Sequence, residues 1–358
     1  MFPYWLLFSI FAAGALNYRR RAAVGMQAAP FLLLAALLIA AMIGLRYETG
    51  ADWESYTEIF EYTGFLNLRE ALSLGDPGYS LLNWLAHAFE LDLWFVNLAC
   101  GVIFTWGLIA FAKRQPNPWL VIVIAVPYLV IVVAMGYSRQ GVAIGLMMAA
   151  LAALDRMALG RFVVYVVLAA AFHKTAVMVL PLVALSASKH RAVTGSILFA
   201  GIVMLYFFFL DAGVERLLSI YVDAAYESQG AEIRVAMNTI PAIIFLYFQK
   251  RFDLTEGQRK LWRNFSYAAL ALAPLLIIVP SSTAIDRLGL YLIPLQLFVL
   301  SRLPEAFPEK SKANAQIAMG VILYSALIQF VWLTFATHAE YWLPYQVYPL
   351  LESDRYLY

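Results

Sequence analysis

The 358-residue sequence is 63% hydrophobic and only 13% charged, which leaves too little polar surface to cover a soluble globule of this size. Its net charge of +2 gives no basis for nucleic-acid binding, and its single cysteine excludes a disulfide framework or a cysteine metal site within one chain. Composition therefore predicts a chain whose main solvent is lipid.

Apolar runs follow one another along the chain, separated by short charged loops, and most have roughly the length that a helical membrane crossing needs. The first run is followed by its arginines, the reverse of a cleavable signal peptide, so we expect it to be retained as a helix. About twelve transmembrane helices are expected, at residues 3–17, 28–45, 94–112, 118–135, 138–154, 161–173, 175–187, 193–210, 236–250, 264–280, 287–301 and 313–335. We predict an all-α polytopic membrane protein with a single integral membrane domain over residues 1–358.

Residues 46–93 are predicted to form a long loop that contains a further apolar stretch at 78–90. Counting this stretch as a crossing would invert every later loop, so we interpret it as a re-entrant or interfacial helix. With the N-terminus outside, 17 of the 25 Lys and Arg lie on the inner side and 18 of the 23 acids on the outer side. This agrees with the positive-inside rule, and it predicts that the 46–93 loop faces the periplasm of a bacterial inner membrane.

Two short runs, 161–173 and 175–187, meet at His173 and Lys174. Broken helices of this kind are tolerated at membrane depth only where they line a cavity, and ionisable groups at that depth are candidates for function. His173 is therefore a candidate general base, although a lone histidine also serves as a structural hydrogen-bonding group. The sequence leaves both interpretations open.

Three arginines lie against helix ends on the outer face, which is otherwise poor in cations: Arg46, Arg139 and Arg287. The planar guanidinium offers paired donors to phosphate oxygens and stays charged in a low dielectric, so three of them around a cavity predict a diphosphate site. Gln140 lies beside Arg139 in this segment. The alternative is that each arginine reaches to lipid headgroups or pairs with an acid, as Arg287 could with Asp286.

The first outer loop supplies carboxylates, and a sugar hydroxyl that attacks in glycosyl transfer needs a general base. Glu48, Asp52 and Glu54 are candidates. Tyr56 and Tyr79 could stack on sugar rings, although aromatic side chains are also expected at a bilayer interface without any ligand. Asp52 and Glu54 lack a third convergent metal ligand, so no metal or other cofactor is predicted.

Five motifs recur in a fixed order along the chain, and a closing aromatic segment, Tyr341–Tyr345, follows them. The motifs are Arg46-x-x-x-Gly50-x-Asp52-x-x-x-Tyr56, Asp76-Pro77-Gly78-Tyr79, Ser138-Arg139-Gln140, Phe172-His173-Lys174-Thr175-Ala176 and Asp286-Arg287-Leu288-x-x-Tyr291. Over nearly the whole chain this pattern resembles the EpsG family of Wzy-type exopolysaccharide and O-antigen polymerases. Asp76 stands where relatives usually show Glu, and Thr175 where they usually show Ser; both departures preserve the chemistry.

The resemblance implies a GT-C-like membrane fold and a glycosyltransferase without a cofactor. Such a polymerase transfers a growing chain from undecaprenyl diphosphate onto the next lipid-linked repeat at the periplasmic face. Carried onto this sequence, Asp52 or His173 would act as the base, and Arg139 would stabilise the leaving diphosphate. The expected substrate-binding residues are Arg46, Arg287, Lys174, Gln140, Tyr56, Tyr79 and Glu48.

The expected partners are the undecaprenyl-diphosphate-linked oligosaccharide, membrane lipids, a chain-length regulator and the export machinery, with no nucleic acid. Two other activities use similar groups. A flippase or transporter of lipid-linked oligosaccharide would also place arginines and a broken helix around a polar cavity, but should show repeated halves and charges reachable from both faces. An O-antigen ligase-like transferase would need a different acceptor pocket.

Overall fold

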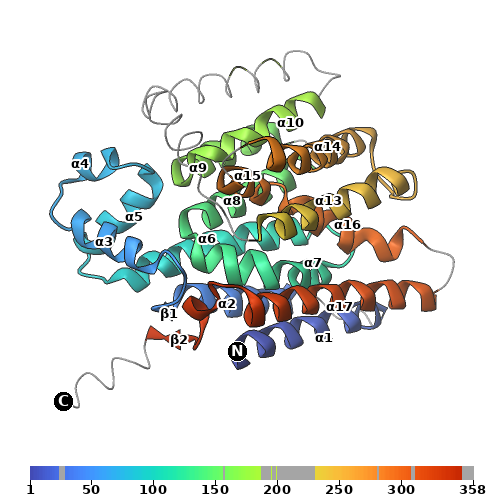
Figure 1. The fold of residues 1–358 in the computed structure, drawn as a ribbon, viewed down its shortest axis with the longest axis horizontal. Coiled ribbons are helices and arrows are strands. Elements are labelled where there is room, and N and C mark those ends of the chain that lie inside the picture. Colours follow the sequence, from blue (N-terminus) through green and yellow to red (C-terminus); the bar gives the residue numbers. More distant parts are fainter. Residues whose placement is uncertain are drawn as a thin grey trace. The chain divides into compact units, whose positions relative to one another are not determined.

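The computed structural model of the protein describes residues 1–23, 29–155, 158–186, 195, 199, 230–279, 282–307 and 311–348. Nearly all of the described chain is helical (Figure 1), and its strands are only two residues long. The chain divides into two compact units, Met1–His173 with Ala318–Tyr358, and Lys174–Ile317. Each unit is described by itself, and the single membrane domain stays a prediction.

The first unit is a set of apolar helices with a group of short helices, α3 to α5, at one end (Figure 1). Its elements are α1 (Phe2–Ala23), α2 (Ala29–Gly44), β1 (Arg46–Tyr47), α3 (Trp53–Thr63), α4 (Leu68–Ser73), α5 (Pro77–Ala88), α6 (Leu93–Ala112), α7 (Pro118–Ala125), a π-helix (Val126–Ala134), α8 (Ser138–Leu154), α9 (Leu159–Phe172), a 3₁₀ turn (Ala339–Trp342) and β2 (Gln346–Val347). The helix α17 (Ser311–Phe335) belongs to this unit from Ala318 onward.

Close packing of α6 on α8 holds the centre of the first unit. A Cβ atom on Gly107 would lie 1.9 Å from the backbone oxygen of Gly145, and one on Gly145 would lie 2.6 Å from the Cα of Phe104. Small residues at these two crossing points let the two backbones approach each other directly, as in membrane helix pairs. This contact fixes α8, whose first turn carries Ser138 and Arg139.

The segment before α8 is a nine-residue π-helix that continues α7 without a break. Pro127 lies near the start of this π-helix, where it cannot donate a backbone hydrogen bond. Long π-helical stretches are rare, and shorter π-bulges occur often at functional sites. The π-helix ends at Ala134, and Tyr137, which has non-helical backbone angles, separates this segment from α8.

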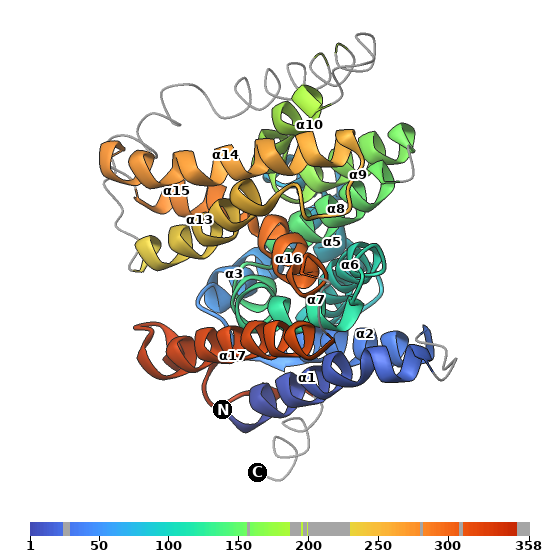
Figure 2. The ribbon, with the colours of Figure 1, turned by 90° about the vertical axis from the view of Figure 1, so that its right-hand side faces the viewer.

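The second unit packs α13 (Ala231–Phe248) against α14, α15 and α16, with α10 against α14 (Figure 2). Aromatic side chains form its core: the Trp262 ring stacks on Phe298 at 4.0 Å, and Phe245 meets Phe298 edge to face. Its remaining elements are a 3₁₀ turn (Lys174–Val179), α10 (Leu180–Ser186), α14 (Glu256–Ile278), α15 (Ser282–Leu290), α16 (Ile293–Arg302) and a 3₁₀ turn (Leu303–Glu305).

Four helices in the described residues are long and apolar enough to cross a membrane by length and composition: Leu93–Ala112, Ala231–Phe248, Glu256–Ile278 and Ala313–Phe335. Several shorter apolar helices accompany them, including Pro30–Gly44 and Ser138–Leu154. These helices indicate an integral membrane protein. Apart from residues 195 and 199, the predicted run at 193–210 lies outside the described residues. The full count of crossings and the GT-C-like fold stay predictions.

The observed breaks agree with the sequence in one place and differ in another. The helix α9 ends at Phe172 and His173 is extended, as the break predicted at His173 requires. The run 287–301, predicted as one crossing, is instead two helices, α15 and α16, separated at Tyr291 and Leu292. Pro294 at the start of α16 explains this difference, because proline has no N–H for the preceding turn and favours a helix start.

Candidate functional site

Arg46 is completely buried, with 1% of its surface exposed, and its donors are used within the first unit. Its Nε donates to the Thr49 carbonyl at 3.2 Å, its Nη1 to the Ile43 carbonyl, and its Nη2 to Ser138 Oγ at 2.8 Å. Burial lowers the pKa of the Arg46 guanidinium, yet arginine stays charged throughout the physiological range. Among the described residues no carboxylate pairs with it, so Arg46 is a fixed positive charge beneath the site.

The loop that carries Arg46 is closed by the C-terminal segment. Strand β1 pairs with β2 in antiparallel register, Arg46 opposite Val347. Gly50 has a φ of +110° and donates its N–H to the Tyr341 carbonyl at 2.8 Å, and a Cβ there would lie 2.7 Å from the Met135 oxygen. Only glycine fits this conformation and this close approach.

The closing aromatic segment also contacts the π-helix. The Trp342 indole donates to the Ile131 carbonyl at 2.6 Å, and the Tyr4 hydroxyl donates to the Trp342 carbonyl at 2.8 Å. The Tyr345 hydroxyl donates to the Met42 carbonyl at 2.9 Å, and burial raises the pKa of this tyrosine to about 12. The segment therefore joins α1, α2 and the π-helix around the Arg46 loop.

Arg139 lies above this buried layer and is half-buried, with 38% of its side chain exposed. Its Nη1 pairs with Asp76 Oδ2 at 3.0 Å, and its guanidinium carbon lies 5.8 Å from the Tyr56 ring centroid. The Tyr56 ring in turn contacts the Tyr79 ring at 5.4 Å. Three of the sequence motifs thus meet here, from α3, α5 and the start of α8.

The face of α5 that packs into the unit holds polar atoms that the described residues leave without a partner. The buried Tyr79 hydroxyl has no hydrogen-bond partner among the described residues. Asn83 donates to the Tyr79 carbonyl, while its own Oδ1 has no donor in the described chain. Asn97 lies on α6, which packs against α5, and neither of its amide atoms is bonded within the described residues. Buried polar groups are normally satisfied, so each of these is a position where a ligand or water can bind.

Asp52 precedes α3 as its N-cap and lies close enough to Tyr56 for its charge to act on the phenol. Burial raises the pKa of Tyr56 and of Tyr79, so both hydroxyls remain protonated at neutral pH. Glu48 is exposed at the tip of the Arg46 loop with a φ of +44°. Gln140 is buried in the first turn of α8, one residue after Arg139.

His173 reaches the same region through its neighbour. A Cβ on Gly78 would lie 2.9 Å from the Phe172 ring, so the end of α9 lies against the start of α5. His173 is the partly buried C-cap of α9, in extended conformation. The structure therefore brings His173 to the helix that carries Tyr79.

The remaining predicted residues belong to the second unit. There the Thr175 hydroxyl donates to the Tyr291 hydroxyl at 3.3 Å, which joins the fourth motif to the fifth. Asp286 pairs with Arg234 at 2.5 Å, an ion pair that was not predicted from the sequence. The convergence of Arg287 and Lys174 with Arg46 and Arg139 stays a prediction, because the two units are described separately.

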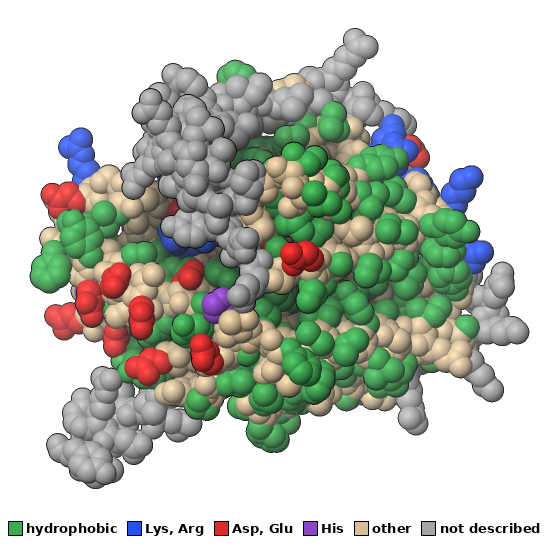
Figure 3. All heavy atoms as spheres, viewed as in Figure 1, with side chains coloured by type: hydrophobic (Ala, Val, Ile, Leu, Met, Phe, Trp, Pro, Cys, Tyr) green, Lys and Arg blue, Asp and Glu red, His purple; other side chains and the backbone are tan. Residues whose placement is uncertain are grey.

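Charge is unevenly distributed around this site. On the face drawn in Figure 3, acidic side chains gather over α3 to α5, while broad areas elsewhere are hydrophobic. Exposed acids of this region include Glu54, Glu58, Glu61 and Glu70. No group of three or more His, Cys, Asp or Glu residues that could hold a metal ion occurs in the described part of the chain.

Sequence reasoning missed several of these contacts. Asp76 was part of a motif but was not recognised as the partner of Arg139, and Ser138 was not recognised as the contact that ties Arg139 to Arg46. Asn83 and Asn97 carried no signal beyond being polar residues within apolar helices. Pairing between segments 60 to 90 residues apart depends on the tertiary packing of α5 against α6 and α9.

Comparison with known proteins agrees with this distribution of motifs. No curated protein and no solved structure matches the chain. The family EpsG matches residues 30–347, a range that contains all five motifs and includes parts of both units. The chain therefore belongs to the EpsG family.

Proposed function

We propose that the protein is a polysaccharide polymerase that joins undecaprenyl-diphosphate-linked oligosaccharide repeats by inverting glycosyl transfer at the periplasmic face of the bacterial inner membrane. Membership in the EpsG family suggests a membrane protein of exopolysaccharide biosynthesis. The observation that supports the finer proposal best is the arginine pair. Arg139 is half-exposed above Tyr56, and Ser138 links it to the buried charge of Arg46.

The reaction needs positive charge where the diphosphate leaves. As the bond between the anomeric carbon and the phosphate oxygen breaks, the electron pair moves onto the diphosphate, and donors fixed in advance stabilise it. Arg139 fits this role because Asp76 holds its guanidinium in one orientation while part of the side chain stays accessible. Arg46 adds positive potential from below without contacting the substrate, and we expect Arg287 and Lys174 to contribute from the second unit.

The acceptor hydroxyl needs a base. The new glycosidic bond forms between this oxygen and the anomeric carbon on the face opposite the leaving group, and the proton moves to the base. Asp52 is the first candidate because it lies beside Tyr56, the same ring that Arg139 covers. His173 is the second, placed next to α5 by the contact of Phe172 with Gly78.

The aromatic pair and the unpaired polar atoms suit a sugar. Tyr56 and Tyr79 offer ring faces, while the Tyr79 hydroxyl and Asn83 Oδ1 offer a donor and an acceptor that the described chain does not use. Gln140 and Glu48 complete the expected binding set. The expected partners beyond the lipid-linked substrate are membrane lipids, a chain-length regulator and the export machinery.

A flippase of the same lipid and an O-antigen ligase-like transferase are the alternatives. Two measurements distinguish a polymerase from a flippase and from a ligase. A strain without the gene should accumulate glycan of a single repeat in place of long polymer; a flippase defect would instead leave no repeats at the surface. The purified protein, reconstituted with lipid-linked repeat alone, should make polymer, whereas a ligase would require a different acceptor. Absence of polymer in that reconstitution, with correctly folded protein, would refute the proposal.

A further inference from the structure

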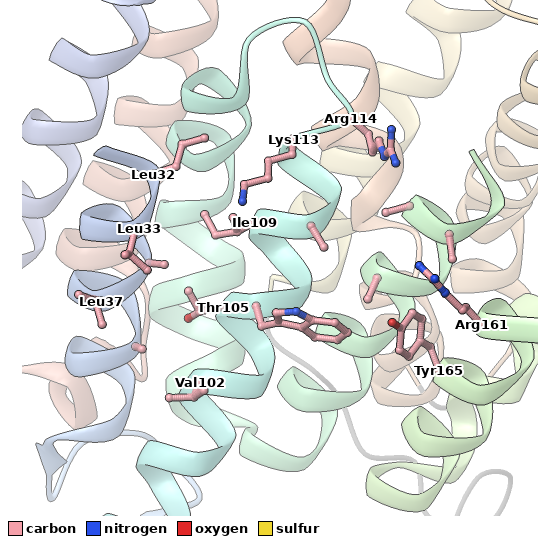
Figure 4. A pocket seen from close by; sticks show the side chains of 17 residues that line it. Leu32, Leu33, Leu37, Val102, Thr105, Ile109, Lys113, Arg114, Arg161 and Tyr165 are labelled. Carbon is pink, nitrogen blue, oxygen red and sulfur yellow. The ribbon is translucent and has the colours of Figure 1, made fainter. Parts of the chain in front are cut away.

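A groove of about 520 Å³ opens between α2, α6, α8 and α9 within the first unit, away from the site described above (Figure 4). Its walls are mainly apolar, and several of their side chains are exposed although hydrophobic, among them Leu33, Leu37, Val102 and Trp106. The Trp106 ring meets Tyr165 of α9 edge to face at 5.3 Å. An apolar groove of this size on a membrane helix bundle suits hydrocarbon chains.

One end of this groove is basic. Lys113 and Arg114 follow the last residue of α6, and Arg161 lies in the first turn of α9; all three line the groove. In Figure 4 the Lys113 side chain extends toward α2, and Arg161 lies beside Tyr165. Lys113 and Arg161 are exposed, and neither makes an ion pair or hydrogen bond with the described residues. The groove therefore combines hydrocarbon walls with positive charge at one end.

A second observation comes from within the groove wall. Thr105 lines the groove and is 2% exposed, and its hydroxyl has no hydrogen-bond partner in the described chain. It lies two turns of helix, about 12 Å, from Lys113 along α6. A buried hydroxyl without a partner in the described chain is a position where a polar atom of a ligand, such as an ester oxygen, can bind.

We propose that this groove binds an anionic phospholipid, with the phosphate at Lys113, Arg114 and Arg161 and the acyl chains along α2 and α6. The basic end matches the phosphate of such a lipid, and the apolar walls match its acyl chains. A zwitterionic lipid also carries a cationic group in its headgroup, which the basic side chains would repel. This site differs from the candidate active site. Lys113 follows the last residue of α6, whereas Asn97, the α6 residue at the candidate active site, precedes it by 16 residues, or about 24 Å along the helix. The inference does not depend on the proposed polymerase activity.

The test is lipid binding by the full-length, delipidated protein in detergent, measured by native mass spectrometry. Phosphatidylglycerol should bind more tightly than phosphatidylcholine with the same acyl chains. Lys113→Gln and Arg161→Gln should each weaken phosphatidylglycerol binding about fivefold, and the double variant about 25-fold. Lys250→Gln is the matched control, because Lys250 is likewise an exposed lysine after an apolar helix, and its affinity should equal that of the unchanged protein.

A second measurement locates the lipid. Phosphatidylglycerol with brominated chains should quench tryptophan fluorescence, and the quenched fraction should fall in Trp106→Phe. Equal affinity for the two lipids, an equal loss in Lys250→Gln, or unchanged affinity in the double variant would overturn the proposal. Displacement by inorganic phosphate at matched concentration would show an anion site instead, and preferential displacement by undecaprenyl phosphate would show a polyprenyl site; either result would also overturn it.

Discussion

Arg46 and Arg139 are both arginines on one side of the first unit, but their surroundings give them different roles. Arg46 uses its donors on two backbone carbonyls and one serine, so that it positions the chain around it. Arg139 has one carboxylate partner and remains half-exposed. From the sequence alone, both arginines were predicted to bind the diphosphate, because the residue type does not show how deeply a side chain is buried.

Arg139→Lys should lower polymerisation at least tenfold while protein abundance in the membrane stays near normal. Lysine keeps the charge but cannot reproduce the planar fork that Asp76 orients and that matches phosphate oxygens. The measurement is polymer formed in vitro from purified lipid-linked repeat. Arg69→Lys is the control, since Arg69 is an exposed arginine of α4, and it should change nothing. Full-length polymer from Arg139→Lys would show that Arg139 does not stabilise the leaving diphosphate.

Asp52→Asn should reduce the rate by about 100- to 10,000-fold if Asp52 takes the acceptor proton, because the amide keeps the shape but not the basicity. Binding of the lipid-linked repeat should survive and is measured in parallel. His173→Gln should keep part of the activity if His173 only orients the end of α9. Full activity of Asp52→Asn would exclude Asp52 as the base, and lost binding in this variant would make it a positioning residue.

Tyr79→Phe removes only the Tyr79 hydroxyl, so that its effect on activity can be measured apart from its effect on stability. The Tyr79 hydroxyl is buried and has no partner in the part of the chain that the structure describes, so its removal should leave the thermal midpoint unchanged or slightly higher. If this hydroxyl bonds to the sugar, the same variant should raise KM or lower kcat several-fold. Wild-type kinetics together with an unchanged melting temperature would contradict a role in binding.

At the scale of elements, apolar runs located the long helices well. The crossing predicted at 94–112 is α6, Leu93–Ala112. A long apolar segment in lipid forms a helix because only a helix satisfies all of its backbone hydrogen bonds within the segment. Within the 46–93 segment, α5 corresponds to the helix predicted at 78–90, whereas α3 and α4 were not predicted individually. One signal was available: Asn67 and Glu70 form a capping box that starts α4.

Other features lay beyond local pattern. Nothing in the apolar sequence of residues 126–134 distinguishes a π-helix from an α-helix, since the choice depends on packing against distant segments such as the one that carries Trp342. The pairing of β1 with β2 joins residues about 300 positions apart, and two-residue strands have no periodicity to detect.

Trp342→Phe should destabilise the protein more than Trp332→Phe. Both changes remove the same atoms from neighbouring rings, whose centroids are 5.6 Å apart. The Trp342 indole donates a hydrogen bond to the Ile131 carbonyl of the π-helix, whereas the Trp332 indole has no acceptor among the described residues. Leaving a buried carbonyl unpaired costs about 1–3 kcal/mol. The measurement is the thermal midpoint in detergent by intrinsic fluorescence. Equal shifts in the two variants would show that this hydrogen bond contributes nothing.

At the scale of the molecule, the charge asymmetry predicts sidedness. In a Cys100→Ala background, Glu61→Cys in α3 should react with an impermeant thiol reagent added outside, and Glu256→Cys at the start of α14 should not. Permeabilised cells should label both, which provides the control for accessibility. Labelling of residue 256 from outside would reverse the assignment of faces and remove the basis for a periplasmic site.

The pairing of β1 with β2 has a consequence for the order of events during synthesis. The Arg46 loop is held by the Gly50 bond to Tyr341 and by the strand partner at Val347. At about 5–20 residues per second, the ribosome makes that partner roughly 15–60 s after Arg46. Throughout this interval the nascent chain cannot complete the loop beneath Arg139. Most of the polypeptide must therefore be synthesised before the candidate site can assemble. As a result, the protein cannot become active before its membrane helices have been made.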